Sequence, residues 1–316
     1  MENKLYVSSS PHFRSNNSTR RIMLDVIIAL LPTSVAACVI FGFRSAVLIA
    51  VCVATCVLLE YVSRKIMKRD TTIGDLSAVV TGLLLALNLP VDINPLIAMF
   101  GCLIAIVVVK QMFGGIGMNF VNPALAARIV LLVSFPSAMM HWVTVPGQPQ
   151  GAMIDATTSA TPLAAKAGTY SYIDLLIGRC GGSIGEVCAI ALILGGIYLV
   201  IRRVISPIIP CVYLATAALM SLAFGLDPLY QILAGGLLLG AIFMATDYTT
   251  SPVTNWGKVV YAIGCGVLTM LLRTYSNMPE GVSFSILLMN ILVPHIERLT
   301  APRTLGFVKK AKGEKK

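Results

Sequence analysis

The side chains best suited to covalent chemistry lie in one short polar stretch, residues 155–162, with the sequence Asp-Ala-Thr-Thr-Ser-Ala-Thr-Pro. Hydroxyl groups come from Thr157, Thr158, Ser159 and Thr161, and the alanines beside them leave room for an approaching protein. A threonine hydroxyl is a weak nucleophile without activation, so a group transfer onto this stretch needs an external enzyme. The structural alternative is a surface turn that these hydroxyls cap.

A second polar stretch, residues 113–123, combines three glycines with two asparagines. Glycine lets a backbone approach a planar ligand closely, and the amides of Asn119 and Asn122 can pair with the edge of a heterocycle. Asn122 before Pro123 also predicts a helix start, with asparagine as the N-cap and proline at the first helical position. Ligand contact and helix capping can coexist here.

A third polar stretch, residues 243–252, ends an apolar run with an acid, several hydroxyls and a proline. The pattern is typical of a helix end followed by a turn. Asp247 and Thr250 could also coordinate a cation or a ligand at that end of the helix. The sequence leaves both interpretations open.

The elements that position these stretches are predicted from composition. The 316 residues are 57% hydrophobic and 12% charged, with a mean hydropathy of +0.84, which excludes a soluble domain. A membrane-spanning helix needs roughly 20 apolar residues. We therefore expect an all-α polytopic membrane protein with ten spans, at residues 22–43, 45–63, 73–89, 94–109, 121–135, 184–201, 207–225, 229–246, 257–272 and 282–295.

Basic residues gather at alternate ends of these spans, which predicts the orientation of the chain. The cations expected on one side are Lys4, Arg14, Arg20, Arg21, Arg64, Lys65, Lys68, Arg69, Lys110, Arg202, Arg203, Lys258 and Arg298. Both termini are then cytoplasmic, and residues 136–183 form an extracytoplasmic loop. The net charge of +10 therefore reports orientation and not nucleic-acid binding, and the lysine-rich tail is expected near anionic lipid headgroups.

The two halves of the chain resemble each other in several short patterns. Gly82 precedes three leucines, and so does Gly236; Gly101-Cys102 precedes Lys110 as Gly264-Cys265 precedes Arg273. Five spans per half would place the halves in opposite orientations, as in inverted-repeat transporters. The predicted units are a segment at 1–21, repeats at 22–135 and 184–298, the loop at 136–183 and a basic tail at 299–316.

The remaining polar residues suggest neither a metal centre nor a complete active site. Seven of the eight cysteines lie in or beside apolar runs, where small residues pack between helices, and only three histidines occur. Arg128 lies inside an apolar run and is expected to pair with another residue. Asp25 and Glu60 are expected at the membrane interface, where Asp25 could pair with a neighbouring helix.

The three stretches occur in the order typical of a known family, and the resemblance covers essentially the whole chain. Residues 155–161 resemble the Asp-x-x-(Ser/Thr)-Gly-Ala-Thr motif on which flavinyltransferases attach FMN. Together with residues 113–123 and 243–252, they resemble the RnfD family of membrane subunits of Rnf-type ion-translocating electron-transport complexes. That family is related to the NqrB subunits of the sodium-pumping NADH:quinone reductase. Ser159 replaces the usual glycine, and Thr158 takes the Ser/Thr place.

The resemblance implies a membrane flavoprotein subunit with a fold similar to urea and ammonium channels. It implies FMN linked to Thr161 within the attachment motif of Asp155, Thr158, Ser159 and Ala160, and a second, noncovalent flavin (riboflavin), for which Asn119 and Asn122 are the candidate contacts. Implied partners are a flavinyltransferase and other subunits of the complex, including an iron–sulfur or flavin-carrying partner on the outer face. The complex would couple ferredoxin and NAD chemistry to Na⁺ or H⁺ movement. The alternative is an inverted-repeat channel or secondary transporter without a redox cofactor.

Overall fold

The computed structural model describes residues 18–143, 161–163, 170–276 and 281–302. Their regular elements are helices, and no β-strand occurs among them. The N-terminal half comprises α1 (Thr19–Phe41), α2 (Phe43–Ile66), η1 (Ile73–Asp75), α3 (Ser77–Leu87), α4 (Pro95–Leu103), the π-helix η2 (Ile104–Gln111) and α5 (Pro123–Ser134). The C-terminal half comprises α8 (Ala189–Ile201), α9 (Ile208–Ala223), α10 (Pro228–Leu233), α11 (Leu237–Leu239), the π-helix η4 (Gly240–Met244), α12 (Asn255–Tyr275) and α13 (Gly281–Thr300). Two short helices, α6 (Pro136–Met139) and α7 (Tyr172–Ile177), lie between the halves.

Four of the described helices, α1, α2, α12 and α13, are long and apolar enough to cross a membrane. Five shorter apolar helices accompany them. The prediction of an all-helical, multi-pass membrane protein is therefore confirmed, whereas the count of ten spans stays a prediction. The predicted span at 229–246 differs most, because the described chain breaks there into α10, α11 and η4.

Asparagine or aspartate followed by proline starts three of the helices. The side chains of Asn94, Asn122 and Asp227 each accept a hydrogen bond from a backbone N–H in the first turn of α4, α5 and α10. Proline lacks an N–H and has the helical φ already, so it fits the position after such a cap. The predicted capping role of Asn122 is confirmed, with Ala124 N–H and Leu125 N–H donating to its Oδ1 at 3.0 and 3.4 Å.

Two helices, α3 in the first half and α11 in the second, begin after a residue in the left-handed conformation. Leu76 has φ 59° and ψ 6° before α3, and Gly236 has φ 64° and ψ 4° before α11. The same number of residues separates Leu76 from Gly236 as separates the start of α4 at Pro95 from the start of α12 at Asn255. Gly82, which the leucine pattern pairs with Gly236, is instead helical and packs on the backbone of Val53.

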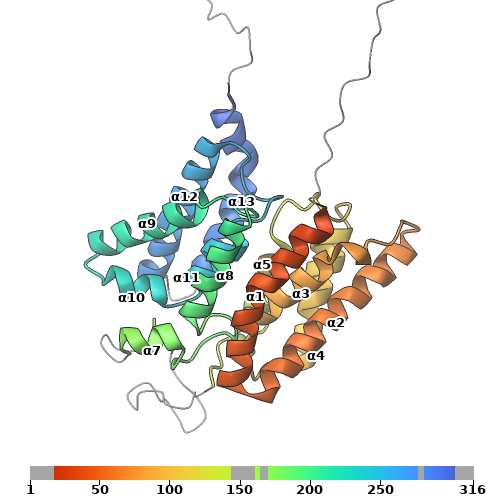
Figure 1. Ribbon diagram of the computed structural model, residues 1–316, viewed down its shortest axis with the longest axis horizontal. Helices are drawn as coiled ribbons and strands as arrows, with labels where there is room; N and C mark the ends of the chain where they lie inside the picture. Colours follow the sequence, from red (N-terminus) through yellow and green to blue (C-terminus); the bar gives the residue numbers. More distant parts are fainter. Residues whose placement is uncertain (1–17, 144–160, 164–169, 277–280, 303–316) are drawn as a thin grey trace, which may run out of the picture.

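The two halves lie side by side and meet along a seam (Figure 1). The seam pairs α1 with α8 and α5 with α13. A Cβ at Gly195 of α8 would lie 2.2 Å from the carbonyl oxygen of Ala29 in α1, so glycine permits this close approach. In Figure 1 the start of α1 and the end of α13 lie at the end of the molecule opposite α7.

Candidate functional site

Residues 161–163, called the Thr161 segment here, contact α10 and the turn that follows it. Thr161 is 4% exposed, and its Oγ1 has no hydrogen-bond partner among the described residues. The hydroxyl of Tyr230, on α10, donates to the carbonyl oxygen of Pro162 at 2.8 Å. Leu163 packs against Gly235, where a Cβ would lie 2.2 Å from Leu163 Cδ1.

The turn between α10 and α11 lies against this segment. Arg273, at the end of α12, stabilises the conformation of that turn. The Arg273 guanidinium donates to the carbonyl oxygens of Gln231, Ala234 and Gly235 at 2.6, 3.0 and 2.7 Å. Gly235 and Gly236 both have positive φ, at 70° and 64°, which a residue with a Cβ adopts only with strain. Two glycines and one forked cation therefore define the turn against which Leu163 packs.

The start of α10 is tied to α7 through Asp227. The hydroxyl of Tyr172 donates to Asp227 Oδ2, while Leu229 N–H donates to Asp227 Oδ1 at 3.0 Å. The hydrogen bond from Tyr172 lowers the pKa of Asp227 below its ordinary value, and the same bond raises the pKa of Tyr172. Asp227 is thus an ionised cap that connects α7 with the helix carrying Tyr230.

The other residues of the predicted attachment motif, Asp155, Thr158, Ser159 and Ala160, lie outside the described residues. The predictions for them, and the role of Thr161, stay predictions.

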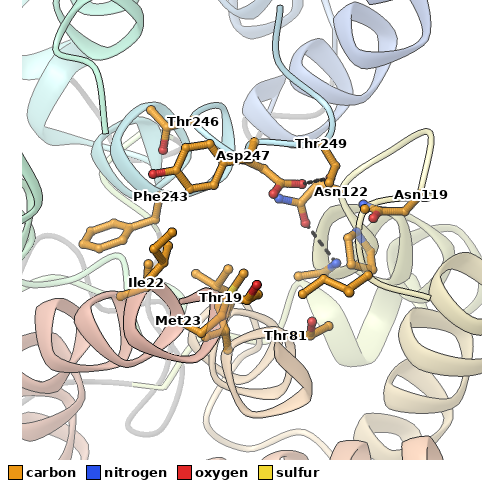
Figure 2. Close-up of a pocket in the computed structure, with 18 of the residues that line it drawn as sticks. Thr19, Ile22, Met23, Thr81, Asn119, Asn122, Phe243, Thr246, Asp247 and Thr249 are labelled. Carbon is orange, nitrogen blue, oxygen red and sulfur yellow. Dashed lines mark hydrogen bonds between the residues drawn. The ribbon is translucent and has the colours of Figure 1, made fainter. Parts of the chain in front are cut away.

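A large cavity, of about 400 Å³, lies away from the Thr161 segment. It brings together the second and third polar stretches of the sequence, because Asn119 and Asn122 line it together with Thr246, Asp247 and Thr249. Figure 2 shows Thr19 and Met23 of α1 on one side of the cavity and Asp247 and Thr249 on the other. The wall thus combines both halves of the chain and is mostly apolar.

A hydrogen bond joins the two halves of the chain beside the polar residues of the cavity. Asn122 Nδ2 donates to the carbonyl oxygen of Met244 at 3.3 Å, and Thr249 and Thr250 donate to Asp247 Oδ2 at 2.9 and 3.2 Å. Burial raises the pKa of the Asp247 carboxyl, against the effect of these hydroxyls and of Asn119. The two asparagines and Asp247 therefore present amide and carboxyl groups to one ligand-sized space.

A buried ion pair borders the same cavity. Lys110, which also lines the cavity, donates to Glu60 Oε2 at 3.0 Å and to Ser77 Oγ at 2.7 Å. Gln111 and Thr72 donate to Glu60 Oε1 at 3.1 and 2.8 Å, which satisfies the carboxylate further. Within the protein the Glu60 side chain is 1% exposed, while its place at the membrane interface stays a prediction. Lys110 is similarly buried, with its side chain 4% exposed, so it is a structural cation.

Two other charged residues pair as the sequence predicts. Arg128 donates to Asn88 Oδ1 at 2.7 Å, and Arg202 donates to both carboxylate oxygens of Asp25 at 3.3 Å. No group of three metal-ligating side chains occurs among the described residues. Sequence reasoning missed the Lys110–Glu60 pair, although two opposite charges inside apolar runs were the available signal.

Comparison with known proteins gives a consistent match over almost the entire chain. A match to the NQR2, RnfD, RnfE family covers residues 6–306. The chain is 49% identical to the D subunit of the Na⁺-translocating ferredoxin:NAD⁺ oxidoreductase complex of Acetobacterium woodii, over 98% of this chain and 97% of the relative. It is 39% identical to the D subunit of the proton-translocating ferredoxin:NAD⁺ oxidoreductase complex of Clostridium ljungdahlii, over 96% of this chain and 97% of the relative. The chain therefore belongs to the NQR2, RnfD, RnfE family.

Proposed function

We propose that the chain is the membrane flavoprotein subunit of an ion-translocating ferredoxin:NAD⁺ oxidoreductase complex. The observation that carries the proposal is the near full-length identity of 49% to a subunit of such a complex. Ion-translocating relatives named for Na⁺ and for protons are both similar to this chain, so the coupling ion is left open. Membrane-length apolar helices support the membrane assignment.

The proposed carrier of covalent FMN is Thr161. A buried hydroxyl oxygen without a hydrogen bond costs about 1–3 kcal/mol, and Oγ1 of Thr161 is such an atom among the described residues. A phosphoester would use this same oxygen. Arg273 lies against Gly235, which contacts Leu163, so a cation is close to the segment that would carry the phosphate. The residues present fit the group.

The second, noncovalent flavin is proposed for the cavity lined by Asn119, Asn122 and Asp247. A volume of about 400 Å³ lies within the 300–1,000 Å³ typical of small-molecule sites. The amides of Asn119 and Asn122 would pair with the polar edge of the ring system, and the apolar side chains of Met23 and Phe243 would cover its faces. When bound, the flavins supply one- and two-electron redox chemistry, while the protein sets their position and environment.

The proposed topology has ten spans in two inverted repeats and places both termini in the cytoplasm. The left-handed residues before α3 and α11 and their matching spacing to α4 and α12 support two related halves. The Thr161 segment would then face outward, where an iron–sulfur or flavin-carrying subunit of the complex exchanges electrons with it. A flavinyltransferase would attach the FMN.

The decisive experiment is mass spectrometry of the peptide that contains Thr161, from complex made in a host with the flavinyltransferase. We expect an added FMN mass in the parent and its loss in Thr161→Val. Flavin released by denaturation should persist in Thr161→Val and fall in Asn122→Leu, which separates the two sites.

The control is Ser137→Ala, which removes an exposed hydroxyl of α6 outside the attachment motif and should leave the FMN mass unchanged. A parent protein without covalent FMN, and indistinguishable from Thr161→Val in ferredoxin:NAD⁺ activity, would contradict the proposal. Solute flux by that flavin-free protein would favour the channel or secondary transporter instead.

A further inference from the structure

A second cavity, of about 220 Å³, lies where the start of α1 meets the end of α8. Its wall is more polar than that of the large cavity, and three arginines contribute to it. The lining includes Arg21, Asp25, Arg202, Arg203, Val204 and Tyr248. Tyr248 forms part of the wall shared with the large cavity, and its hydroxyl donates to the carbonyl oxygen of Val204.

Positively charged residues outnumber negatively charged residues around this cavity. Asp25 is 8% exposed and is engaged by Arg202 and by the hydroxyl of Tyr198, which donates to it at 3.0 Å. Arg21 and Arg203 form no ion pair with the described residues. One acid therefore faces three cations, and two positive charges are left at the cavity for an anion.

The backbone at Arg203 supports a role for its side chain. Arg203 follows the last turn of α8 with φ 56°, a conformation in which glycine is the usual residue. Any side chain at such a position is disfavoured relative to glycine, because its Cβ crowds the backbone. The chain nevertheless presents a long cation there, at the same cavity as Arg21.

Exposed apolar side chains continue from the arginines along both helices. On α1, Leu24 and Ile28 follow Arg21 at helical spacing and are 41% and 38% exposed. On α8, Ile197 and Ile201 precede the arginines and are 51% and 73% exposed. Residues three, four or seven apart lie on one helix face, so Arg21 shares a face of α1 with Leu24 and Ile28, and Ile197 shares a face of α8 with Ile201. Arg202 and Arg203 directly follow Ile201 at the end of α8.

We propose that this arginine cavity binds the phosphate headgroup of an anionic phospholipid whose acyl chains lie along α1 and α8. Basic pockets between membrane helices are suited to such headgroups. A free phosphate ion would use the arginines but not the apolar surface beside them, which is why the lipid is the favoured source. The lipid would bridge the two halves of the chain at the seam between α1 and α8.

The test uses the detergent-purified complex and native mass spectrometry with added phosphatidylglycerol or phosphatidylcholine. The parent should retain phosphatidylglycerol in preference to phosphatidylcholine. Arg21→Gln with Arg203→Gln should weaken phosphatidylglycerol binding about 25-fold, roughly fivefold for each cation. Arg202 is left unchanged because it holds Asp25. Arg298→Gln, at a cation of α13 outside the cavity, is the matched control and should bind like the parent.

Several outcomes would overturn the proposal. Equal retention of phosphatidylcholine, or unchanged phosphatidylglycerol binding in the double variant, would remove the headgroup site. Competition by inorganic phosphate at the strength of the lipid would assign the arginines to a soluble anion. A photoreactive residue in place of Leu24 should cross-link to lipid, and a cross-link to another subunit would identify a protein interface instead. Loss of released flavin in the double variant would assign the arginines to the ligand of the large cavity.

Discussion

Two clamps, one in each half of the chain, hold the starts of α3 and α11, and they work differently. Lys110 at the end of η2 binds the side chains of Ser77 and Glu60 near the start of α3. Arg273 at the end of α12 binds the backbone carbonyls of residues before α11. In each half, a cation thus lies at the start of a helix that follows a left-handed residue.

The difference shows what each of the two clamps depends on. The Lys110 clamp requires a particular carboxylate, because an unpaired buried charge is strongly destabilising. The Arg273 clamp requires a particular backbone shape, which Gly235 and Gly236 permit. The Lys110 clamp is therefore a closed charge pair beside the large cavity, and the Arg273 clamp is a shaped turn beside the Thr161 segment.

The largest expected effect comes from removing the cation that pairs with the buried Glu60 carboxylate. Lys110→Met leaves Glu60, which is 1% exposed, without its cation, and we expect a loss of about 3–5 kcal/mol in stability. Thermal unfolding of the purified complex measures it. Adding Glu60→Gln to Lys110→Met should recover much of the loss, because no buried charge then remains.

The matched control for this prediction is the exposed pair of Arg44 and Asp92, whose side chains are 73% and 38% exposed. Exposed pairs contribute about 0–1 kcal/mol, so Arg44→Gln should change stability little. Equal losses in Lys110→Met and Arg44→Gln would show that burial does not distinguish the two pairs.

A smaller effect is expected from Arg273→Lys. Lysine keeps the charge but cannot reach three carbonyl oxygens with a rigid fork, so we expect a loss of about 2–3 kcal/mol. If the turn positions the Thr161 segment, the amount of FMN on Thr161 should fall as well. Unfolding temperature and flavin fluorescence of the denatured band measure the two effects.

Gln231→Ala serves as the control, because it removes only the bond from Arg273 to Gln231 Oε1 at 3.1 Å. It should cost about 1 kcal/mol and leave flavin attachment unchanged. A normal unfolding temperature in Arg273→Lys would mean that charge alone, and not the fork, maintains the turn.

The smallest effect is a pH dependence at Asp227. Its folded-state pKa lies below the ordinary value of 3.8, so its stabilising contribution is present above that value and is lost as the pH falls through the folded pKa. Amide hydrogen exchange of Leu229 and Tyr230, corrected for the intrinsic exchange rate, should therefore accelerate as the pH falls through the folded-state pKa of Asp227. Asp227→Asn keeps a good N-cap without a titrating group and should abolish this acceleration. An unaltered pH profile in Asp227→Asn would exclude Asp227 as its source.

Local features of the fold were predictable because they depend on neighbours in sequence. Apolar runs predicted a multi-pass helical protein, and Asn122 before Pro123 predicted a helix start. Asn119 and Asn122 were predicted as ligand contacts and do line a cavity. Charge counting did not indicate that Lys110 is buried, since a lysine at the end of an apolar run can be solvated or buried, and hydropathy alone does not distinguish the two.

The sequence by itself determined that this chain is a helical membrane protein, where its polar stretches begin, and which family it belongs to. Only the tertiary structure decided that Asp247 joins Asn119 and Asn122 at one cavity, and that Lys110 meets Glu60. Helices that are apolar on most sides carry little periodic signal for which face turns inward. The rotation and depth of each helix, and so its polar partners, are set by packing against helices far away in sequence.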